Sequence, residues 1–274
     1  METEKNNTKM KQVVVFSPSR YSLYTICVAE LLKRNNIHIK AIVIRRLFNP
    51  GRFLFEIKRD GTRLIKKIWK KLFLRKKAYH QSHYETIVDL MKNENIHFSK
   101  VDDFHKYYGI PIIYCNNLND TIVINTLQKL KPDIVVFTGG GLIRNDILMN
   151  SGAGVLNCHM GVLPQYRGMD VVEWPILENN FDQIGMTAHF MDNGVDTGDI
   201  LHVKKIEIDP CKNIKQLRDK FEPIMCRLMV QVCIDYLNGK LKRVKQQLNA
   251  GKQYFIMHPR LVEIAESKLM QKSQ

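Results

Sequence analysis

Three side chains in this sequence have the chemistry that a carbonyl-transfer reaction needs: Asn157, His159 and Asp196. Asn157 and His159 stand two residues apart at the end of an apolar run, and residues two apart in a strand project from the same face. Asp196 follows in a glycine-containing turn after a second predicted strand. An amide can stabilise a negative oxygen, a carboxylate can accept a proton, and an imidazole changes charge near neutral pH. The three residues therefore predict one site for carbonyl transfer.

The elements that must position these residues alternate between strands and helices along the chain. Apolar runs predict strands at 11–16, 37–44, 133–139 and 154–159, and helical periodicity predicts helices at 21–35, 120–130 and 214–238. This alternation is typical of an α/β fold, a doubly wound and mostly parallel sheet with helices on both faces. Ligands of such sheets bind outside the carboxyl ends of the strands, which is where Asn157 and His159 fall.

Several motifs around these residues resemble the folate-dependent formyltransferase superfamily, which includes glycinamide ribonucleotide, methionyl-tRNA and sugar N-formyltransferases. The likeness is strong from about 131 to 201 and fainter over the first strand, its helix and residues 103–118. It rests on the Asn-x-His strand end, a Leu-Pro-x-Tyr-Arg-Gly loop at 163–168 and a Val-Asp-x-Gly turn at 195–198.

Two segments depart from the pattern of that superfamily. Met160-Gly161 replaces the usual Pro-Ser after the histidine, a change that should leave the chemistry intact. Residues 17–20, Ser-Pro-Ser-Arg, stand where some relatives have a glycine-rich phosphate loop. The second departure argues against a ribonucleotide phosphate site.

The resemblance implies a Rossmann-like domain that passes the formyl group of 10-formyltetrahydrofolate to a primary amine. Asn157 would then donate its amide to the negative oxygen, with help from a protonated His159. Asp196 would orient the imidazole and take the proton that the attacking nitrogen loses, directly or through a water. We therefore expect alanine at 157, 159 or 196 to abolish most of the turnover without unfolding the protein.

The resemblance also implies where the folate and the acceptor bind. The triple glycine at 139–141 matches the loop that helps hold the pterin in the family, and glycine backbones allow a flat ligand to approach closely. Arg20, Tyr166 and Arg167 are the expected substrate contacts, although Tyr166 and Arg167 could equally be loop anchors. The histidines and cysteines show no metal-ligand spacing, so no metal is expected. The expected cofactor contacts are Gly139, Gly140, Gly141, Leu142, Ile143, Arg144, Asp192, Gly194 and Val195.

His189 and Trp174 each allow two interpretations. His189 lies on a predicted strand, where it could be a satisfied half-buried histidine or a second residue of the site, and the sequence favours the former. Trp174 begins an apolar helix, where a core position is more typical than a stacking platform.

Positive charge is concentrated in one stretch of the chain. The formal net charge is +15, and residues 45–77 contain 13 lysines and arginines against Glu56 and Asp60. Residues 46–95 exceed the usual link between the second and third strands of the family, and they include a basic amphipathic helix. This insert could lie on an anionic membrane surface, grip a tRNA acceptor stem, or pack as a flap on the domain or on a second subunit of a homodimer. The sequence favours the flap. The apolar positions of the helix are Leu64, Ile65, Ile68, Trp69, Leu72 and Phe73.

The C-terminal part of the chain bears on the identity of the acceptor. We expect a catalytic domain at 1–206 and a helical extension at 207–274, which lacks the many short strands of the barrel that methionyl-tRNA relatives carry. Together with the missing phosphate loop, this favours an amino sugar, linked to a nucleotide or lipid and destined for surface polysaccharide. Methionyl-tRNA or glycinamide ribonucleotide as acceptor, and a catalytically inactive basic scaffold, are the alternatives.

Composition places the chain among ordinary globular proteins, with 45% hydrophobic and 25% charged residues. The six cysteines form no Cys-x-x-Cys pair, and the polar segment 1–11 does not resemble a signal peptide. No apolar run reaches the ~18–20 residues of a membrane span. These features predict a cytoplasmic enzyme, peripheral to the membrane if the insert binds lipid.

Overall fold

The computed structural model describes residues 10–46, 84–208 and 211–272. Its main element is a seven-stranded sheet built from β1 (Gln12–Ser17), β2 (His38–Arg45), β3 (Ile112–Cys115), β4 (Ile134–Phe137), β5 (Val155–His159), β7 (Gly185–Phe190) and β8 (Ile200–Lys205). The strand order is β3-β2-β1-β4-β5-β7-β8. The pairs from β3 to β5 are parallel, whereas β7 is antiparallel to both of its neighbours. The predicted α/β fold with a mostly parallel sheet is therefore confirmed.

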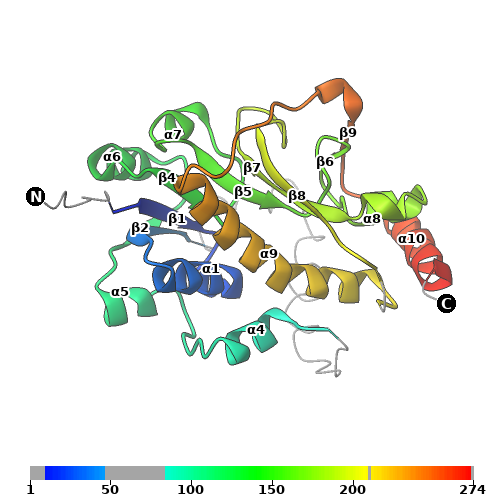
Figure 1. Cartoon of the computed structure of the whole chain (residues 1–274), viewed down its shortest axis with the longest axis horizontal. Helices are drawn as coiled ribbons and strands as arrows, with labels where there is room; N and C mark the ends of the chain where they lie inside the picture. Colours follow the sequence, from blue (N-terminus) through cyan, green and yellow to red (C-terminus); the bar gives the residue numbers. More distant parts are fainter. Residues whose placement is uncertain (1–9, 47–83, 209–210, 273–274) are drawn as a thin grey trace, which may run out of the picture.

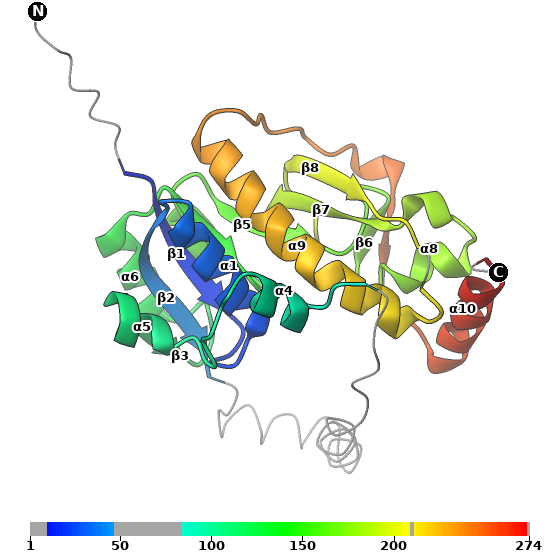
Figure 2. The same ribbon diagram turned by 60° about the horizontal axis from the view of Figure 1, so that its bottom comes forward.

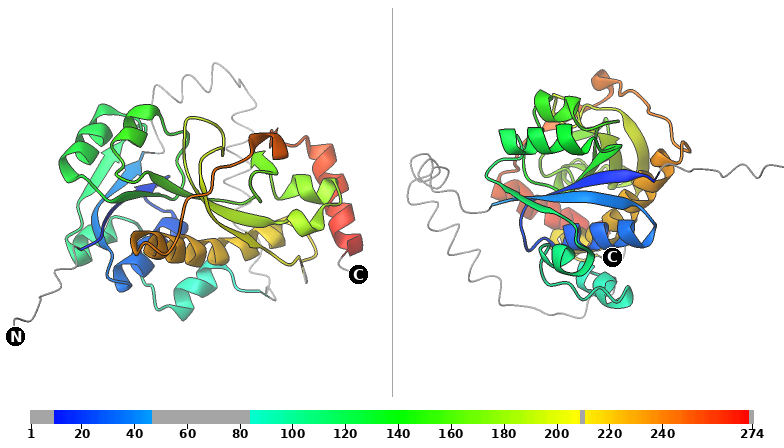
Figure 3. Two further views of the ribbon diagram at one scale, coloured as in Figure 1. Left: turned by 45° about the horizontal axis from the view of Figure 1, so that its top comes forward. Right: turned by 90° about the vertical axis from the view of Figure 1, so that its left-hand side faces the viewer.

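Helices cover both faces of this sheet (Figure 1). One face is covered by α1 (Leu23–Arg34), α4 (Ile87–Asn93), α5 (Asp103–Tyr108) and the long α9 (Ile214–Leu237). The opposite face is covered by α6 (Thr121–Leu130) and α7 (Asn145–Met149), and the two layers are seen edge-on in Figure 3. The helices thus bury the two faces of the sheet in separate apolar clusters.

The β1 strand shows how the sequence produces these two clusters. Val13 and Val15 pack into the cluster beneath α1 and α9, while Val14 and Phe16 pack into the cluster beneath α6 and α7. All four side chains are fully buried, because a central parallel strand is covered on both faces and so needs a continuous apolar run.

Polar side chains at the helix starts set the boundaries of the helices that cover the sheet. The hydroxyl of Ser22 accepts a hydrogen bond from the backbone N–H of Thr25 at the start of α1, and Asn213 does the same for Gln216 at the start of α9. Each cap satisfies a backbone donor that lacks a partner in the first helical turn. The observed ends of α1, α9 and the predicted strands lie within two residues of the expected ones.

A small second sheet lies beside the main one. It pairs β6 (Tyr166–Gly168) with β9 (Lys252–Tyr254) in parallel, and α8 (Glu173–Leu177) packs against α10 (Pro259–Lys272) next to it (Figure 2). Two short 3₁₀ turns complete the described elements, at Phe181–Gln183 and Leu248–Ala250. The end of the described chain is therefore placed against the loop that follows β5.

The predicted division of the chain at residue 206 remains a prediction, but the structure shows what α9 contacts. Leu217, Phe221 and Cys226 of α9 are fully buried in the same apolar cluster as α1. The long helix therefore completes the core of the main sheet, whatever the role of the segment that follows it.

Most of the predicted basic insert lies outside the described residues. The apolar positions of its amphipathic helix, between 64 and 73, belong to that part, so the three uses of the insert stay predictions. Residues 84–95 are described, and there Glu85 accepts two hydrogen bonds from Arg227 of α9. Within the described ranges, none of the helices combines the length and the hydrophobicity that crossing a bilayer requires.

Candidate active site

The pairing of β5 with β7 brings the predicted polar residues together on one face. Asn157 lies opposite His189 and His159 lies opposite Thr187 in this antiparallel pair. Leu156 and Cys158 of β5 point to the other face, into the cluster beneath α9. The predicted alternation of β5 is confirmed, and it places an amide and two imidazoles side by side.

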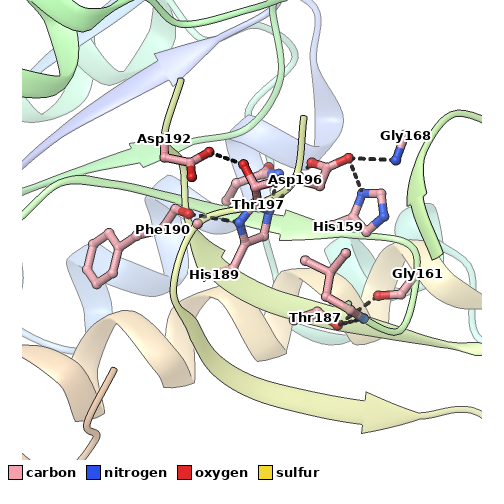
Figure 4. Close-up of polar contacts among 12 residues, drawn as sticks. His159, Gly161, Gly168, Thr187, His189, Phe190, Asp192, Asp196 and Thr197 are labelled. Atoms are coloured by element: carbon pink, nitrogen blue, oxygen red, sulfur yellow. Dashed lines mark hydrogen bonds and ion pairs between the residues drawn. The ribbon is translucent and has the colours of Figure 1, made fainter. Parts of the chain in front are cut away.

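The carboxylate of Asp196 lies between the two imidazoles (Figure 4). Its Oδ2 atom is 3.5 Å from His159 Nδ1, and its Oδ1 atom is 3.7 Å from His189 Nε2. The backbone N–H of Gly168 donates a hydrogen bond of 2.9 Å to Oδ2. The Asp196 side chain is only 17% exposed, so the negative charge is held in a site that is largely shielded from water.

Hydrogen bonding determines which nitrogen of His189 carries the proton. Nδ1 is 2.9 Å from the carbonyl oxygen of Phe190, which can only accept, so Nδ1–H donates to it. Nε2 of the neutral ring then accepts from the amide of Asn157 at 3.2 Å. Burial, reinforced by the nearby His159, lowers the pKa of His189 well below its ordinary value and keeps the ring neutral. A neutral His189 therefore orients the Asn157 amide.

His159 has different surroundings from His189. Its Nε2 is 2.9 Å from the carbonyl oxygen of Tyr166, while its Nδ1 faces the Asp196 carboxylate. Both partners are acceptors, so both ring nitrogens donate only when the ring is an imidazolium. A Cβ at position 161 would come within 2.7 Å of His159 Nε2, which is why the chain has a glycine there. In this chain Gly161 therefore leaves room for the imidazole.

The loop from 191 to 199 presents Asp196 to the two histidines. Asp196 itself has a φ of +53°, in the left-handed region that few residues other than glycine adopt. Inside the loop, Asp192 Oδ1 accepts hydrogen bonds from Gly194 N and Thr197 Oγ1, at 3.0 and 2.6 Å. The predicted cofactor residue Asp192 therefore folds this turn, and its carboxylate is engaged by the turn itself.

The predicted pterin loop lies on the same face of the sheet as the histidines. Gly139, Gly140 and Gly141 all have positive φ, between +113° and +131°. Asn119 fixes the following residues, because its side chain donates to the Leu142 carbonyl at 2.8 Å and accepts from the Arg144 N–H at 2.7 Å. Beyond these hydrogen bonds, Leu142 is 75% exposed. The loop offers a rigid backbone and one free apolar side chain.

Two observations test whether the pterin loop and the 191–199 loop could hold a flat ligand between them. Ile143 of the first loop is buried in the apolar cluster beneath α6 and α7, and Met191 of the second loop packs against that same cluster. Gly194 and Val195 extend the second loop toward Asp196 without large side chains. Peptide groups beside an apolar wall suit a flat ring with polar edges, so the residues present fit the expected folate.

The structure corrects the prediction that the Tyr166 side chain meets the substrate. Tyr166 is 3% exposed, its hydroxyl donates to Glu178 at 2.8 Å and accepts from Asn180 at 2.8 Å, and its ring stacks on Tyr254. Burial raises the pKa of this phenol to about 12. Tyr166 contacts the site through its backbone carbonyl, while its side chain anchors the loop.

Arg167 and Arg20 are placed differently from each other. Nη2 of Arg167 donates to the carbonyls of Leu248 and Gly251, both at 3.3 Å, so this guanidinium ties the loop after β5 to the C-terminal segment. Arg20 pairs with Asp102 at 3.2 Å beyond the end of β1. Its side chain is 42% exposed, so it remains accessible from solvent.

Sequence reasoning missed two contributions to the site and underrated a third. The sequence favours a satisfied half-buried histidine at 189 over a second residue of the site, yet His189 contacts both Asn157 and Asp196. The position of His189 opposite Asn157 can be recognised only when the pairing of β5 with β7 is known. Gly168 ends the motif at 163–168, but nothing in the motif indicated that its N–H donates to Asp196. The side chain of Gln246, which donates to the Asp196 carbonyl at 2.9 Å, left no signal in the sequence.

Two further features of the described residues lie outside this constellation. A depression of about 510 Å³, lined by Lys11, Asp133, Tyr236 and Leu241, lies where the loop after α9 meets the residues that precede β1 and β4. The pterin loop follows the other end of β4, so the depression lies at the opposite edge of the sheet from this loop. In the part of the chain that the structure describes, no group of three or more histidine, cysteine or acidic side chains could hold a metal ion.

Comparisons with known proteins match the region that carries this site. A family model described as "Formyl transferase" matches residues 76–233. The methionyl-tRNA formyltransferase of Finegoldia magna is 36% identical over 142 residues, which are 52% of this chain and 46% of that protein. The chain spans about half the length of the curated relatives it matches.

Solved structures match over more of the chain. The phosphoribosylglycinamide formyltransferase of Bacillus halodurans superimposes with a TM-score of 0.55 and 18% identity, over 83% of this chain and 95% of that one. An N-formyltransferase of Helicobacter canadensis, solved with folinic acid and dTDP-3-aminofucose, gives a TM-score of 0.56 and 14% identity, over 95% of this chain and 81% of that one. At these identities the likeness establishes the shared fold.

Proposed function

This chain belongs to the formyl transferase family, and from that premise we propose that it transfers the formyl group of 10-formyltetrahydrofolate to a primary amine. The observation that carries the proposal is the Asp196 carboxylate placed between two imidazoles, one of which holds the amide of Asn157. A buried carboxylate that faces an imidazole is equipped to accept a proton and to stabilise a cationic ring beside it.

Each residue of the proposed site has one task. 10-Formyltetrahydrofolate, when bound, supplies the formyl carbonyl. The second N–H of the Asn157 amide donates to the carbonyl oxygen as it becomes negative, and a protonated His159 ring adds positive charge beside it. Asp196 takes the proton that the attacking amine must lose, directly or through a water. His189 stays neutral and holds the amide in place. The loops at 139–144 and 191–195 form the proposed folate site.

Methionyl-tRNA is the first candidate for the acceptor. A stretch of 142 residues is 36% identical to the methionyl-tRNA formyltransferase of Finegoldia magna. The comparisons therefore favour this acceptor over the amino sugar that the sequence analysis placed first. A tRNA also suits the net charge of +15, because a polyanion binds through its phosphates.

A nucleotide-linked amino sugar is the second candidate, and one feature of the described tail favours it. Gln246 donates to the Asp196 carbonyl and residues 252–254 pair with β6, so the tail forms one wall of the proposed catalytic region. A wall so close to the carboxylate suits a compact acceptor. Glycinamide ribonucleotide ranks third, because residues 17–20 lack the glycine-rich loop expected for its phosphate.

An acceptor screen tests the proposal and ranks these candidates. The protein is incubated with 10-formyltetrahydrofolate and, separately, with methionyl-tRNA, UDP- and dTDP-linked amino sugars and glycinamide ribonucleotide. Transfer appears as a mass gain of one formyl group on the acceptor, and the Asp196→Asn variant serves as the inactive control. Folate turnover without an acceptor would indicate a hydrolase instead. Folate binding with no transfer to any amine would favour the inactive scaffold protein.

Two further partners rest on the basic insert and belong to the same proposal. An anionic membrane surface or a second subunit could contact residues 46–95, and cosedimentation with anionic and neutral vesicles tests the first. Binding that persists when residues 47–83 are deleted would rule the insert out as the membrane contact. Sedimentation equilibrium of the full chain and of the variant that lacks residues 47–83 measures whether the insert is needed for a homodimer.

A further inference from the structure

The backbone of Asp196 is held from outside its own loop by a residue far along the chain. Gln246 Nε2 donates one hydrogen bond of 2.9 Å to the Asp196 carbonyl and another of 2.6 Å to the Gly198 carbonyl. Both N–H groups of the Gln246 amide therefore donate to the turn that presents the Asp196 carboxylate. This turn contains the left-handed backbone of Asp196, a conformation that costs free energy and persists only where its surroundings enforce it.

Gln246 is itself fixed by its neighbours on both sides. Before it, Val244 exchanges two backbone hydrogen bonds with Ile200, at 2.8 and 2.9 Å, and the Arg243 guanidinium stacks 3.9 Å from the centre of the Phe190 ring. After it, β9 pairs with β6. We call residues 243–257 the C-terminal strap, because it bridges to Ile200 of the main sheet near one end and pairs with β6 of the small sheet near the other. Because the chain is paired on both sides of Gln246, its amide can hold the turn at 196–198 in one conformation.

The strap also reaches the carboxylate by a second route. β6 ends at Gly168, whose N–H donates to Asp196 Oδ2, and Gly168 is paired with Tyr254 of the strap. The next residue, Met169, donates its N–H to the Tyr254 carbonyl at 3.0 Å. Gln246 therefore holds the backbone of Asp196, while β9 holds the strand that binds its side chain. The two contacts fix the carboxylate relative to both histidines.

We propose that Gln246 is a positioning residue for Asp196 and that the C-terminal strap is an integral part of the catalytic site. This inference rests on the proposed function, in which Asp196 accepts the proton of the attacking amine. Gln246 touches neither substrate in this arrangement. Its loss should therefore lower the rate of the reaction without weakening the binding of the folate or the acceptor.

The first variant is Gln246→Met, which keeps the length of the side chain and removes both N–H donors. Misplacement of a catalytic group by about 1 Å can cost on the order of 100-fold in rate, so kcat should fall between about 10- and 100-fold. Each KM should stay within about twofold of wild type, as expected when only transition-state interactions are lost. Gln246→Ala should show the same division between kcat and KM and replaces the methionine variant if that protein does not fold.

A matched control and a second readout separate positioning from simple destabilisation. Gln231→Met removes the amide of an exposed glutamine on α9, whose side chain donates only to Asp235 among the described contacts, and it should behave as wild type. The ring ¹⁵N and ¹H resonances of His159 and His189 report the position of Asp196 directly. These resonances should shift in Gln246→Met and stay unchanged in Gln231→Met.

The possible results distinguish this inference from the proposed function. An active wild type whose folded Gln246 variants keep full kcat would overturn the inference and leave the function intact. A wild type that formylates no amine would overturn the function, and the imidazole resonances would then decide the positioning role alone. Resonances that match wild type in both Gln246 variants would show that the strap does not position Asp196.

Discussion

The two halves of the sheet carry functional groups in different ways. In the parallel half, the interiors of β1 and β4 are apolar and buried, and the polar residues near the site come where the strands end or just beyond, at 17–20 and 138–144. In the antiparallel half, Asn157, His159 and His189 lie within β5 and β7. That face of β5 and β7 can hold polar groups because the 191–199 loop, rather than a helix, covers it. Where a loop replaces a helix, a strand can carry chemistry.

The largest effect should come from the carboxylate of the antiparallel half. Asp196→Asn keeps the shape and removes the negative charge and the proton acceptor, so kcat should fall about 100- to 10,000-fold. Steady-state kinetics with the acceptor found in the screen measure this effect. Asp182→Asn, at an exposed position, is the matched control and should retain full activity. A folded Asp196→Asn protein with normal turnover would place the chemistry elsewhere.

The next effect should come from His189, which tests whether residues within β7 serve the reaction. In His189→Asn the new amide can still donate to the Phe190 carbonyl as Nδ1–H does, but the contacts of Nε2 with Asn157 and Asp196 are lost. We expect kcat to fall about 10- to 100-fold through misplacement of the Asn157 amide. His202→Asn, on the exposed part of β8, is the control. Equal turnover in His189→Asn and His202→Asn would show that His189 serves packing and does not position the Asn157 amide.

The same variant should change how stability depends on pH. Burial lowers the pKa of His189 from 6.5 to about 4, so between these values the unfolded chain binds a proton that the folded chain does not. The free energy of unfolding of the wild type should therefore fall as the pH falls through this window. His189 contributes up to about 3 kcal/mol to this loss. Urea unfolding at several pH values should show a smaller loss for His189→Asn. A larger or equal loss in the variant would mean that His189 is protonated in the folded protein.

A smaller effect is expected from the parallel half, where only the backbone after β4 is proposed to bind ligand. A Cβ at Gly140 would lie 2.6 Å from the Cδ1 atom of the buried Leu118, and the φ of +131° is strained for alanine. Gly140→Ala should shift the loop and raise the KM for 10-formyltetrahydrofolate about tenfold, with kcat nearly unchanged. Gly239→Ala also places alanine at a positive φ, of +72°, but has no neighbour within 4 Å, so it is the control for a positive-φ substitution that displaces no side chain. Equal KM values in the two variants would argue against the folate assignment.

The smallest effect on turnover should come from Tyr166, which lies in β6 of the small sheet, outside both halves of the main sheet. Tyr166→Phe removes the hydrogen bonds to Glu178 and Asn180, which should cost about 1–2 kcal/mol of stability. Because its side chain anchors the loop, kcat should stay within about twofold of wild type. Urea unfolding and steady-state kinetics measure the two quantities. A large loss of kcat in a stable variant would indicate that the Tyr166 hydroxyl contacts the acceptor.

The sequence by itself determined the parts of this protein that follow from local periodicity and short motifs. The apolar runs of β1 and β4, the alternation of β5 and the length of α9 could be read directly, because side-chain direction in a strand or helix repeats with a fixed period. The motifs at 157–159, 163–168 and 195–198 identified the residues that gather around the site. The hydrogen-bonded caps of α1 and α9 stopped those helices close to where the pattern predicted.

Tertiary structure alone decided how these residues meet. The antiparallel register of β7 turned His189 from an ordinary buried histidine into the partner of Asn157, and the packing of the loop after β5 buried the Tyr166 hydroxyl. The contact between Gln246 and Asp196 joins residues fifty positions apart. No local pattern encodes such contacts, because they depend on which distant segments the fold brings together and not on the conformation of either segment alone.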